Sequence, residues 1–194
     1  MQRTIHPFIG SNYNSNGLNG RKILILGESS WHPGDAPADI SKHTQNLAND
    51  AIGYDNGKGY WNTGRFYTRS ARIFGFNARN YSQRDEFWNS VAYYNFLQVI
   101  LSRPKIKPSP EQWQKGEIPF LETLDELTPD YIISFSQRMW KYLPKENEAD
   151  IPNKYGIFAK KAQIGSSVVL GFKHTASFGF KWEQVKEIVE QNIK

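Results

Sequence analysis

Residues 21–37 read RKILILGESSWHPGDAP, and this stretch decides the fold. Its first part, KILILG, is a continuous apolar run with the length of a buried strand, and the chain then turns abruptly polar. In a parallel sheet, ligands are usually bound at the carboxyl ends of the strands. A carboxylate, two hydroxyls, an indole and an imidazole that arrive there together indicate a site. The alternative is a polar loop that only connects a strand to a helix.

Bulk properties exclude several classes of protein. The chain of 194 residues is long enough to form one domain with a proper core. It contains no cysteine, which excludes disulfides, iron–sulfur clusters, cysteine zinc sites and thiol nucleophiles. No apolar run approaches the roughly 20 residues that cross a bilayer, so we expect a cytoplasmic protein without a membrane partner. We expect residues 1–20 to form an irregular N-terminal segment and residues 21–194 to form a single domain.

Strand and helix signals alternate along the chain. Apolar, β-branched or aromatic segments predict strands in KILILG, NSVAYYNFLQ (89–98), DYIISF (130–135) and SSVVLGF (166–172). Helices are predicted between them, and the stretch that contains ENEADIPNKYG (146–156) is expected to be irregular. Strands separated by helices argue for βαβ units. The predicted fold class is therefore α/β, a three-layer α/β/α sandwich with a mostly parallel central sheet.

Some helix boundaries carry specific signals. Ser109 has the character of an N-cap, and Gln112 completes a capping box with it. Ser136 is predicted to cap a short helix after the third strand. The sequence KWEQVKEIVEQNIK predicts a closing helix with Val185, Ile188 and Val189 on one face.

The basic residues are unevenly distributed. The formal net charge is +5, and no acidic residue occurs between Asp55 and Asp85. If residues 64–76 are helical, three arginines at i, i+4 and i+7 form one stripe with aromatic side chains interleaved. Such a stripe could track phosphates and stack on bases, and an ordinary solvated face is the alternative. The arginines are Arg65, Arg69 and Arg72, and the neighbouring residues are Lys58, Tyr60, Trp61, Phe66 and Tyr67.

Three polar residues are each expected where a strand ends. Glu28 follows the first strand, Asn95 lies in the second and His174 follows the last. Because the carboxyl ends of neighbouring parallel strands lie side by side, these residues could converge. Each alone has a simpler explanation, as a solvated carboxylate, a satisfied turn amide or a strand-end cap. We expect no metal site, because the four histidines include no pair at i and i+4.

Six segments occur in a recognisable order between residues 22 and 189: GESSW, GRFYTRSARIFG, YYNFLQVILSRP, PSPEQW, TPDYIISFSQ and HTASFGF. The series resembles the uracil-DNA glycosylase superfamily. The first segment is similar to the family motif G-Q-D-P-Y or G-E-A-P-G. The middle segments are similar to P-F-V-G-x-A-G, T-N-x-x-K-x-R-P, P-x-x-E and P-x-x-I-x-x-L-G of the thermophile-type branch. The last segment is similar to H-P-S or H-P-A.

The chain departs from the family at several motif positions. The branch with the best matching middle segments binds an iron–sulfur cluster through four cysteines, which this chain lacks, so we expect no cofactor. Ser29 stands where the G-Q-D-P-Y form has an aspartate that helps to activate water. Thr175 replaces the usual proline of the last motif, and Ser134 or Ser136 replaces the usual glycine after the third strand.

The resemblance implies a role for each strand-end residue. His174 would donate a hydrogen bond to the departing uracil anion. Glu28 would stabilise the sugar cation or orient water, with Ser29 at the family's water-activating position. The amide of Asn95 would donate to O4 and accept from N3–H, a pattern that fits uracil and rejects cytosine. Phe66 would stack on a flipped base.

The resemblance also implies contacts to the edge of the base and to DNA. Trp31 would close the space beside C5 of the base, and Gly27 belongs to the same base-binding motif. A phosphate track would use basic side chains on one face of the molecule. The candidates for this track are Arg65, Arg69, Arg72 and Lys173.

The implied function is base excision from DNA, single- or double-stranded, by hydrolysis of the N-glycosidic bond to uracil or a related deaminated base. One alternative is a glycosylase-fold protein that has lost hydrolysis and binds a nucleotide, a nucleic acid or a protein partner. Another is a small-molecule hydrolase that uses Glu28, but this leaves the basic residues unexplained.

Overall fold

A computed structural model describes residues 3–31, 39–53, 64–103 and 106–194 of the protein. Within these residues the strands are β1 (Phe8–Ile9), β2 (Ile23–Gly27), β3 (Ser30–Trp31), β4 (Ala92–Asn95), β5 (Ile100–Leu101), β6 (Tyr131–Phe135), β7 (Glu146–Asp150), β8 (Ala159–Ile164) and β9 (Ser167–Phe172). The helices are α1 (His43–Ile52), α2 (Gly64–Ile73), α3 (Tyr81–Ser90), α4 (Pro110–Leu127), α5 (Gln137–Trp140) and α6 (Trp182–Asn192).

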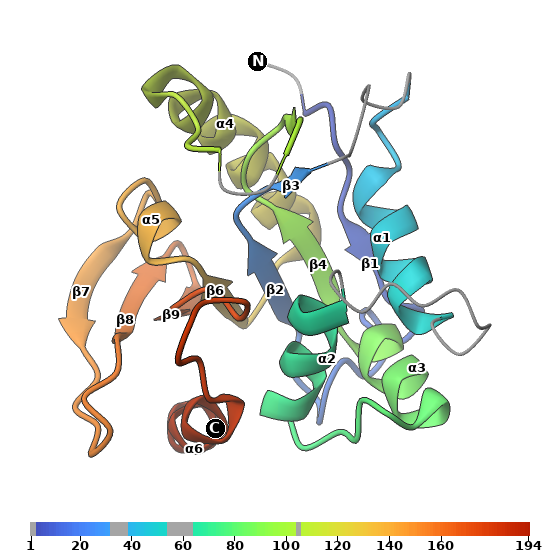
Figure 1. Ribbon diagram of the computed structural model, residues 1–194, viewed down its shortest axis with the longest axis vertical. Helices are drawn as coiled ribbons and strands as arrows, with labels where there is room; N and C mark the ends of the chain where they lie inside the picture. Colours follow the sequence, from blue (N-terminus) through green and yellow to red (C-terminus); the bar gives the residue numbers. More distant parts are fainter. Residues whose placement is uncertain (1–2, 32–38, 54–63, 104–105) are drawn as a thin grey trace.

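The main sheet has seven strands in the order β1-β4-β2-β6-β9-β8-β7 (Figure 1). Its central strands, β4, β2, β6 and β9, are parallel to one another, which confirms the α/β class. Strand β1 pairs antiparallel with β4 at one edge, and β8 and β7 continue the sheet antiparallel at the other. The sheet is therefore mixed, with a parallel centre and antiparallel edges. Strands β3 and β5 form a small separate parallel sheet.

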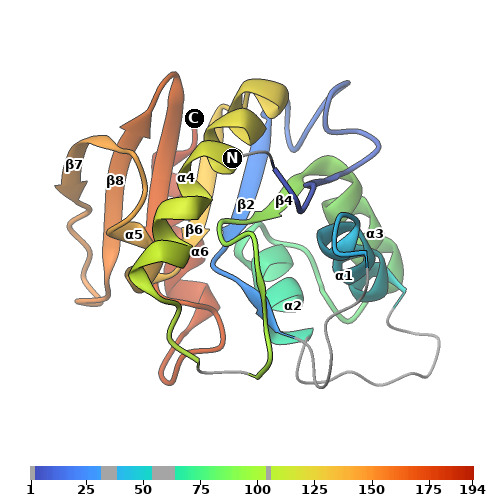
Figure 2. The ribbon, with the colours of Figure 1, turned by 90° about the horizontal axis from the view of Figure 1, so that it is seen from above.

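Both faces of the central strands are buried, which explains their continuous apolar sequence. Ile23 and Ile25 of β2 belong to the core under α1, α2, α3 and α6. Leu24 and Leu26 belong to the core under α4 and α5. Successive side chains of a strand point to opposite faces, so a strand covered on both sides is apolar throughout. Figure 1 shows α2 and α6 in front of the sheet, and Figure 2 shows β7 and β8 on the side away from α1 and α3.

Residues 89–98 do not form the single strand that the sequence predicts. Asn89 and Ser90 close helix α3, and only Ala92–Asn95 form β4. The side chain of Asn80 caps α3 by accepting a hydrogen bond from the backbone N–H of Gln83 at 3.2 Å. The polar sequence of α3 has only weak helical periodicity, so the aromatic content of the following residues dominates the sequence signal.

The stretch that was expected to be irregular contains strands β7 and β8. Strand β8 buries only Ala159, Ala162 and Ile164, and all five residues of β7 are exposed. Strands at the antiparallel edge of a sheet need no continuous apolar run, so the sequence gives little sign of them. A two-residue turn joins β8 to β9, and Gly165 adopts a φ of 55° in it.

The predicted helix caps are confirmed. Ser109 accepts a hydrogen bond from the backbone N–H of Gln112, whose side chain accepts one from the N–H of Ser109. Ser136 caps α5 by accepting a hydrogen bond from the N–H of Met139 at 3.1 Å. Val185 and Ile188 of α6 are buried, as their spacing predicts.

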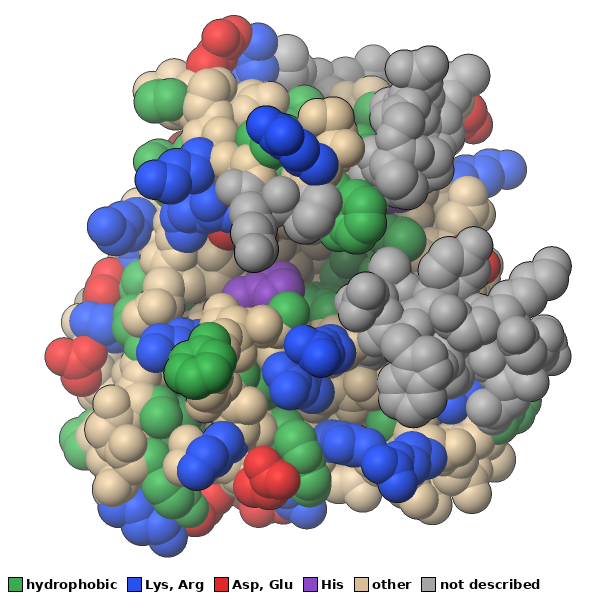
Figure 3. Space-filling model, viewed as in Figure 1, with side chains coloured by type: hydrophobic (Ala, Val, Ile, Leu, Met, Phe, Trp, Pro, Cys, Tyr) green, Lys and Arg blue, Asp and Glu red, His purple; other side chains and the backbone are tan. Residues whose placement is uncertain are grey.

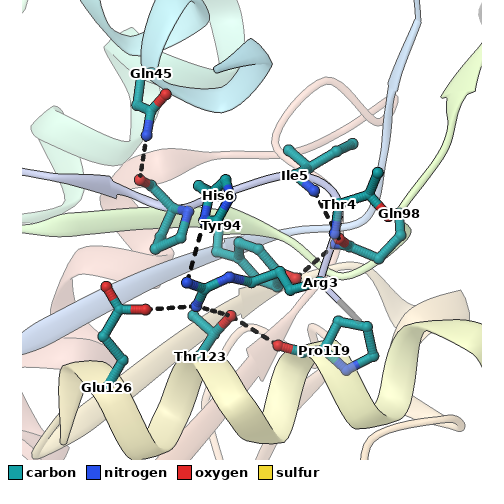
Figure 4. Close-up of polar contacts among 11 residues, drawn as sticks. Arg3, Thr4, Ile5, His6, Gln45, Tyr94, Gln98, Pro119, Thr123 and Glu126 are labelled. Carbon is teal, nitrogen blue, oxygen red and sulfur yellow. Dashed lines mark hydrogen bonds and ion pairs between the residues drawn. The ribbon is translucent and has the colours of Figure 1, made fainter. Parts of the chain in front are cut away.

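The N-terminal segment is tied to the domain by β1 and by polar contacts (Figure 4). Arg3 forms an ion pair with Glu126 of α4 at 2.5 Å. The side-chain oxygen of Gln98 accepts hydrogen bonds from the backbone N–H groups of Thr4 and Ile5. Gln98 lies three residues after Asn95, so these contacts also hold the turn that leaves the carboxyl end of β4.

Candidate functional site

The chain changes direction across the sheet next to β2. Of the parallel strands that follow β2, the next one, β4, lies on one side of it and β6 lies on the other. Ligands in open α/β sheets bind outside the carboxyl ends of the strands at such a switch point. Glu28 directly follows β2, and Ser136 directly follows β6. The candidate site is therefore at this edge.

Glu28 is held by two residues that follow β6. Its side chain is only 8% exposed, and the hydroxyl of Ser136 donates a hydrogen bond to its Oε2 atom at 2.5 Å. Arg138 of α5 donates through Nε to the same oxygen at 3.2 Å and forms an ion pair with Oε1 through its Nη2 atom. Both carboxylate oxygens are thus engaged, and the pair links the ends of β2 and β6.

His174 follows β9 at the same edge. Its Nδ1 atom accepts a hydrogen bond from the backbone N–H of Ala176 at 3.1 Å, so Nδ1 carries no proton. Burial lowers the pKa of His174 below its usual 6.5, an effect that Glu28 opposes and Arg138 reinforces. The ring is therefore neutral near pH 7 and carries its proton on Nε2. No described residue forms a hydrogen bond with Nε2, which leaves this N–H free to donate.

Phe66 of α2 places its ring beside His174. The two ring centroids are 6.0 Å apart, and the rings are tilted by 33°. The ring of Phe66 also lies 5.4 Å from that of Tyr93 in β4 and 5.8 Å from that of Phe135 at the end of β6. Phe66 is only half-buried, so this aromatic cluster presents a ring at the surface of the site.

Asn95 ends β4 and lies directly beside Gly27 of β2 in the parallel ladder. A side chain at Gly27 would overlap with the Oδ1 atom of Asn95, so a glycine is needed here for the two strands to pair with Asn95 in place. Asn95 is 2% exposed, and its Nδ2 atom has no well-aligned hydrogen bond to a described residue. Buried amides are normally paired, and the polar group that acts on this side chain is the Tyr93 hydroxyl.

These residues form one continuous chain of contacts. Burial raises the pKa of the Tyr93 hydroxyl to about 12. The side chain of Asn95 lies near this hydroxyl and limits the rise. Tyr93 contacts Phe66, Phe66 contacts His174, and the charge of Glu28 acts on His174. The four strand-end and aromatic residues that the sequence singles out therefore surround the same edge of the sheet.

Two further residues of the first motif follow Glu28 in the chain. Ser29 is half-buried in the turn between β2 and β3. Trp31, in β3, is 38% exposed and pairs with Leu101 of β5. Ser29 is thus the direct chain neighbour of Glu28, and the indole of Trp31 is partly open to solvent.

The three arginines of the stripe on α2 have different surroundings: one is exposed to solvent, and two contact other parts of the protein. Arg65 is exposed, as is Lys173 after β9. Arg69 donates a hydrogen bond to the backbone carbonyl of Thr175, and Arg72 stacks over the ring of Trp182. Figure 3 shows Lys and Arg side chains around a hollow on this face, and a histidine side chain contributes to its wall. The neighbouring residues Lys58, Tyr60 and Trp61 lie outside the described residues.

Two residues of the site were missed by the sequence reasoning. Arg138 follows the Ser136 cap, but nothing in the sequence indicates that it reaches Glu28 across the sheet. Phe178 is fully exposed at the tip of the loop that follows His174. A phenylalanine between Ser177 and Gly179 in a polar turn is a sequence signal that could have identified it, because a large apolar side chain is unusual there.

Two other hollows of the described chain lie away from this site, and one of about 510 Å³ is lined mainly by polar residues such as Asn14, Arg21 and Asp130. The other hollow, of about 330 Å³ at the opposite edge, is lined mainly by apolar residues such as Leu18, Ile73 and Val189. No three His, Cys, Asp or Glu side chains among the described residues are grouped so that they could hold a metal ion. Within the same ranges, no helix has both the length and the apolar character to span a membrane.

A scan against models of known protein families finds no match to the chain, and a search of curated proteins finds none either.

Proposed function

We propose that this protein is a base-excision glycosylase that hydrolyses the N-glycosidic bond between deoxyribose and uracil, or a related deaminated base, in DNA. The observation that carries the proposal is the state of His174. Its tautomer is set by Ala176, its ring is neutral, and its Nε2–H group is free at the carboxyl edge of the sheet. A fixed neutral donor of this kind suits a reaction in which negative charge develops on a base oxygen.

Cleavage of the N-glycosidic bond depends more on a hydrogen-bond donor to the leaving base than on a strong general base. Cleavage of the bond between C1′ and the base nitrogen leaves an oxocarbenium-like sugar and a base anion, and water then adds to C1′. A hydrogen bond from Nε2 of His174 to a carbonyl oxygen of the base strengthens as the anion forms, so it stabilises the transition state more than the substrate. The carboxylate of Glu28 lies close enough to act electrostatically on His174, and it would favour the cationic sugar in the same way.

Asn95 and Phe66 provide the groups that recognise a uracil-like base. The Nδ2–H of Asn95 would donate to O4, and its Oδ1 atom would accept from N3–H. Cytosine presents the opposite pattern at these positions, so the buried amide would be left unpaired and cytosine would be rejected. The half-buried ring of Phe66 offers a stacking surface between Tyr93 and His174.

DNA is the better candidate substrate than a free nucleotide because of residues at the rim. Arg65 of α2 and Lys173, just before His174, are exposed cations. A fully exposed phenylalanine next to a base site can insert into the space that an extruded nucleotide leaves in the stack. A nucleotide-binding protein would have no use for this exposed ring.

The direct test is base release from oligonucleotides. Single- and double-stranded DNA with one uracil, hypoxanthine or xanthine is incubated with excess protein, and abasic sites are cleaved with alkali. We expect strand cleavage at uracil or at another deaminated base, and none at cytosine. The absence of cleavage on every one of these substrates would contradict the proposal.

The pairing of Glu28 with Arg138 favours one second candidate function, binding without hydrolysis. Both carboxylate oxygens accept hydrogen bonds, and Ser29 supplies no carboxylate at the next position. A base would then be bound by Asn95 and Phe66 but not released from its sugar. The variant Ser29→Asp separates the two functions: if the wild type is inactive and Ser29→Asp cleaves, the base site is intact and lacks only water activation.

A further inference from the structure

The loop between β9 and α6 carries both His174 and Phe178, and Arg69 of α2 contacts it at two points. The guanidinium of Arg69 donates a hydrogen bond to the backbone carbonyl of Thr175, at the start of the loop. The same group lies over the ring of Phe180, at the end of the loop, 5.6 Å from the ring centroid. One side chain from a neighbouring helix thus joins the two ends of a six-residue segment, Thr175 to Phe180.

Within this loop the hydrogen bonds are short-range. The backbone N–H of Ser177 donates to the carbonyl of His174 at 2.9 Å, and that of Phe180 donates to the carbonyl of Ser177 at 3.2 Å. Gly179 adopts a φ of 74°, which lets the chain reverse before α6. Two successive turns of this type have little stability alone. Their position relative to Phe66 and Glu28 therefore depends on contacts with α2 and α6.

The surroundings of Arg69 favour a structural role for its guanidinium. It is partly buried between Arg65 and Arg72, and burial together with these two charges lowers its pKa. The Nη1 group of Arg69 donates to the Thr175 carbonyl and the face of its guanidinium lies over the Phe180 ring, and both partner residues are buried. Arg65, one turn earlier on α2, is exposed and lacks these contacts in the described part of the chain.

We propose that Arg69 is a positioning residue that fixes the loop Thr175–Phe180, and through it the orientation of His174, and that it is not a phosphate contact. The catalytic consequence of this role rests on the proposed function. The contacts of Arg69 with Thr175 and Phe180 do not depend on that function. A planar guanidinium is needed, because one end must donate to a carbonyl while the face stacks on a ring. Lysine supplies the charge without this shape.

The first test does not depend on activity. Hydrogen exchange of the Ala176, Ser177 and Phe180 amides is measured in the wild type, Arg69→Ala, Arg69→Lys and the matched control Arg72→Ala. Arg72 occupies the same helix and stacks on Trp182, but it does not bridge the loop. We expect exchange of these amides to be about tenfold faster in both Arg69 variants and unchanged in Arg72→Ala. Equal protection in all four proteins would overturn the inference.

The second test follows His174 by NMR titration in the same proteins. If the loop loosens, the ring becomes more hydrated and its lowered pKa rises toward 6.5, with Glu28 and Arg138 still present as charged neighbours. We expect this rise in Arg69→Ala and Arg69→Lys but not in Arg72→Ala or Arg65→Ala. A His174 pKa that is the same in every variant would also overturn the inference.

Kinetic measurements then separate this inference from the proposed function. If the wild type releases no base while the exchange and titration results hold, the glycosylase proposal fails and the positioning role of Arg69 stands. If the wild type is active, Arg69→Ala should lower the single-turnover rate about tenfold or more at saturating protein, with little change in the salt dependence of DNA binding. A normal rate combined with a reduced salt slope would instead identify Arg69 as a phosphate contact.

Discussion

The Nδ1 atom of His174 accepts a hydrogen bond from the backbone N–H of Ala176, two residues further along the chain, at 3.1 Å. This local contact fixes which ring nitrogen carries the proton, because Nδ1 accepts and the proton is therefore on Nε2. Thr175, which lies between the two residues, does not disturb it, because the donor is the N–H of the following residue. The key feature of the proposed mechanism therefore depends on the backbone of this turn.

The first prediction concerns the pH dependence of folding. His174 has a lower pKa in the folded protein than 6.5, so below pH 6.5 the unfolded chain binds more protons at this residue than the folded chain does. Stability therefore falls as the pH is lowered from 7 through the folded pKa. His174→Asn keeps an acceptor for the Ala176 N–H but does not titrate. Urea unfolding between pH 7 and 5 should show that the free energy of unfolding falls less in His174→Asn than in the wild type. The same pH dependence in both proteins would contradict a lowered pKa of His174.

The second prediction concerns the Glu28–Arg138 pair. Arg138→Ala leaves the buried carboxylate with Ser136 as its remaining hydrogen-bond donor among the contacts described above, so the free energy of unfolding should fall by about 1–3 kcal/mol. The double variant Glu28→Gln with Arg138→Ala should be more stable than the sum of the single effects implies, because an uncharged amide needs no counterion. Denaturant titration of the four proteins measures this coupling, and strict additivity would show that the pair does not matter to folding.

The third prediction concerns the contact between β2 and β4. Gly27→Ala introduces a methyl group where the Oδ1 atom of Asn95 lies, so the Asn95 side chain or the strand must move. We expect a loss of about 1–3 kcal/mol in stability and weaker binding of free uracil, followed by calorimetry. Gly165→Ala, at the β8–β9 turn with a φ of 55°, serves as a control that is strained but far from Asn95. Equal uracil binding by wild type and Gly27→Ala would separate Asn95 from base recognition.

The fourth prediction concerns electrostatic contacts with DNA. Arg65 is exposed on α2, and its removal should weaken binding similarly for all sequences and reduce the slope of log K against log salt by about one unit or less. Fluorescence anisotropy at several salt concentrations provides this slope, and Lys173→Ala should have a comparable effect. The protein should remain folded in both cases, because exposed cations contribute little to stability. Unchanged slopes in both variants would show that this face is only solvated.

The sequence predicts the centre of the fold well because the physical signals there are local. The run around Ile25 is apolar on both faces of the strand, which indicates a covered parallel sheet, and Ser109 with Gln112 forms a complete capping box. The β8 strand gives little sequence signal because only Ala159, Ala162 and Ile164 of its six residues are buried, without a regular alternation. Its stability comes from pairing with β9, which no short window of sequence contains.

The site shows the same difference between local sequence signals and contacts between distant parts of the chain. Glu28, Asn95 and His174 can be placed at one edge from the sequence, since each lies at a strand end and parallel strands end together. The roles of Arg69 and Arg138 cannot be predicted in this way, because each side chain reaches across the structure to an element far away in the sequence. Helical spacing groups Arg69 with Arg65, but only tertiary contacts distinguish a residue held by a carbonyl from one that faces solvent.

The most direct test of the account is the single-turnover rate of uracil release by wild type and His174→Ala. If His174 donates to the leaving base, the wild type should release uracil from the oligonucleotide, and the variant should do so on the order of a hundredfold more slowly or worse, with DNA affinity little changed. Affinity is measured in parallel by anisotropy on uncleaved DNA. Release of uracil at the same rate by both proteins, or no release by either, would contradict the central claim.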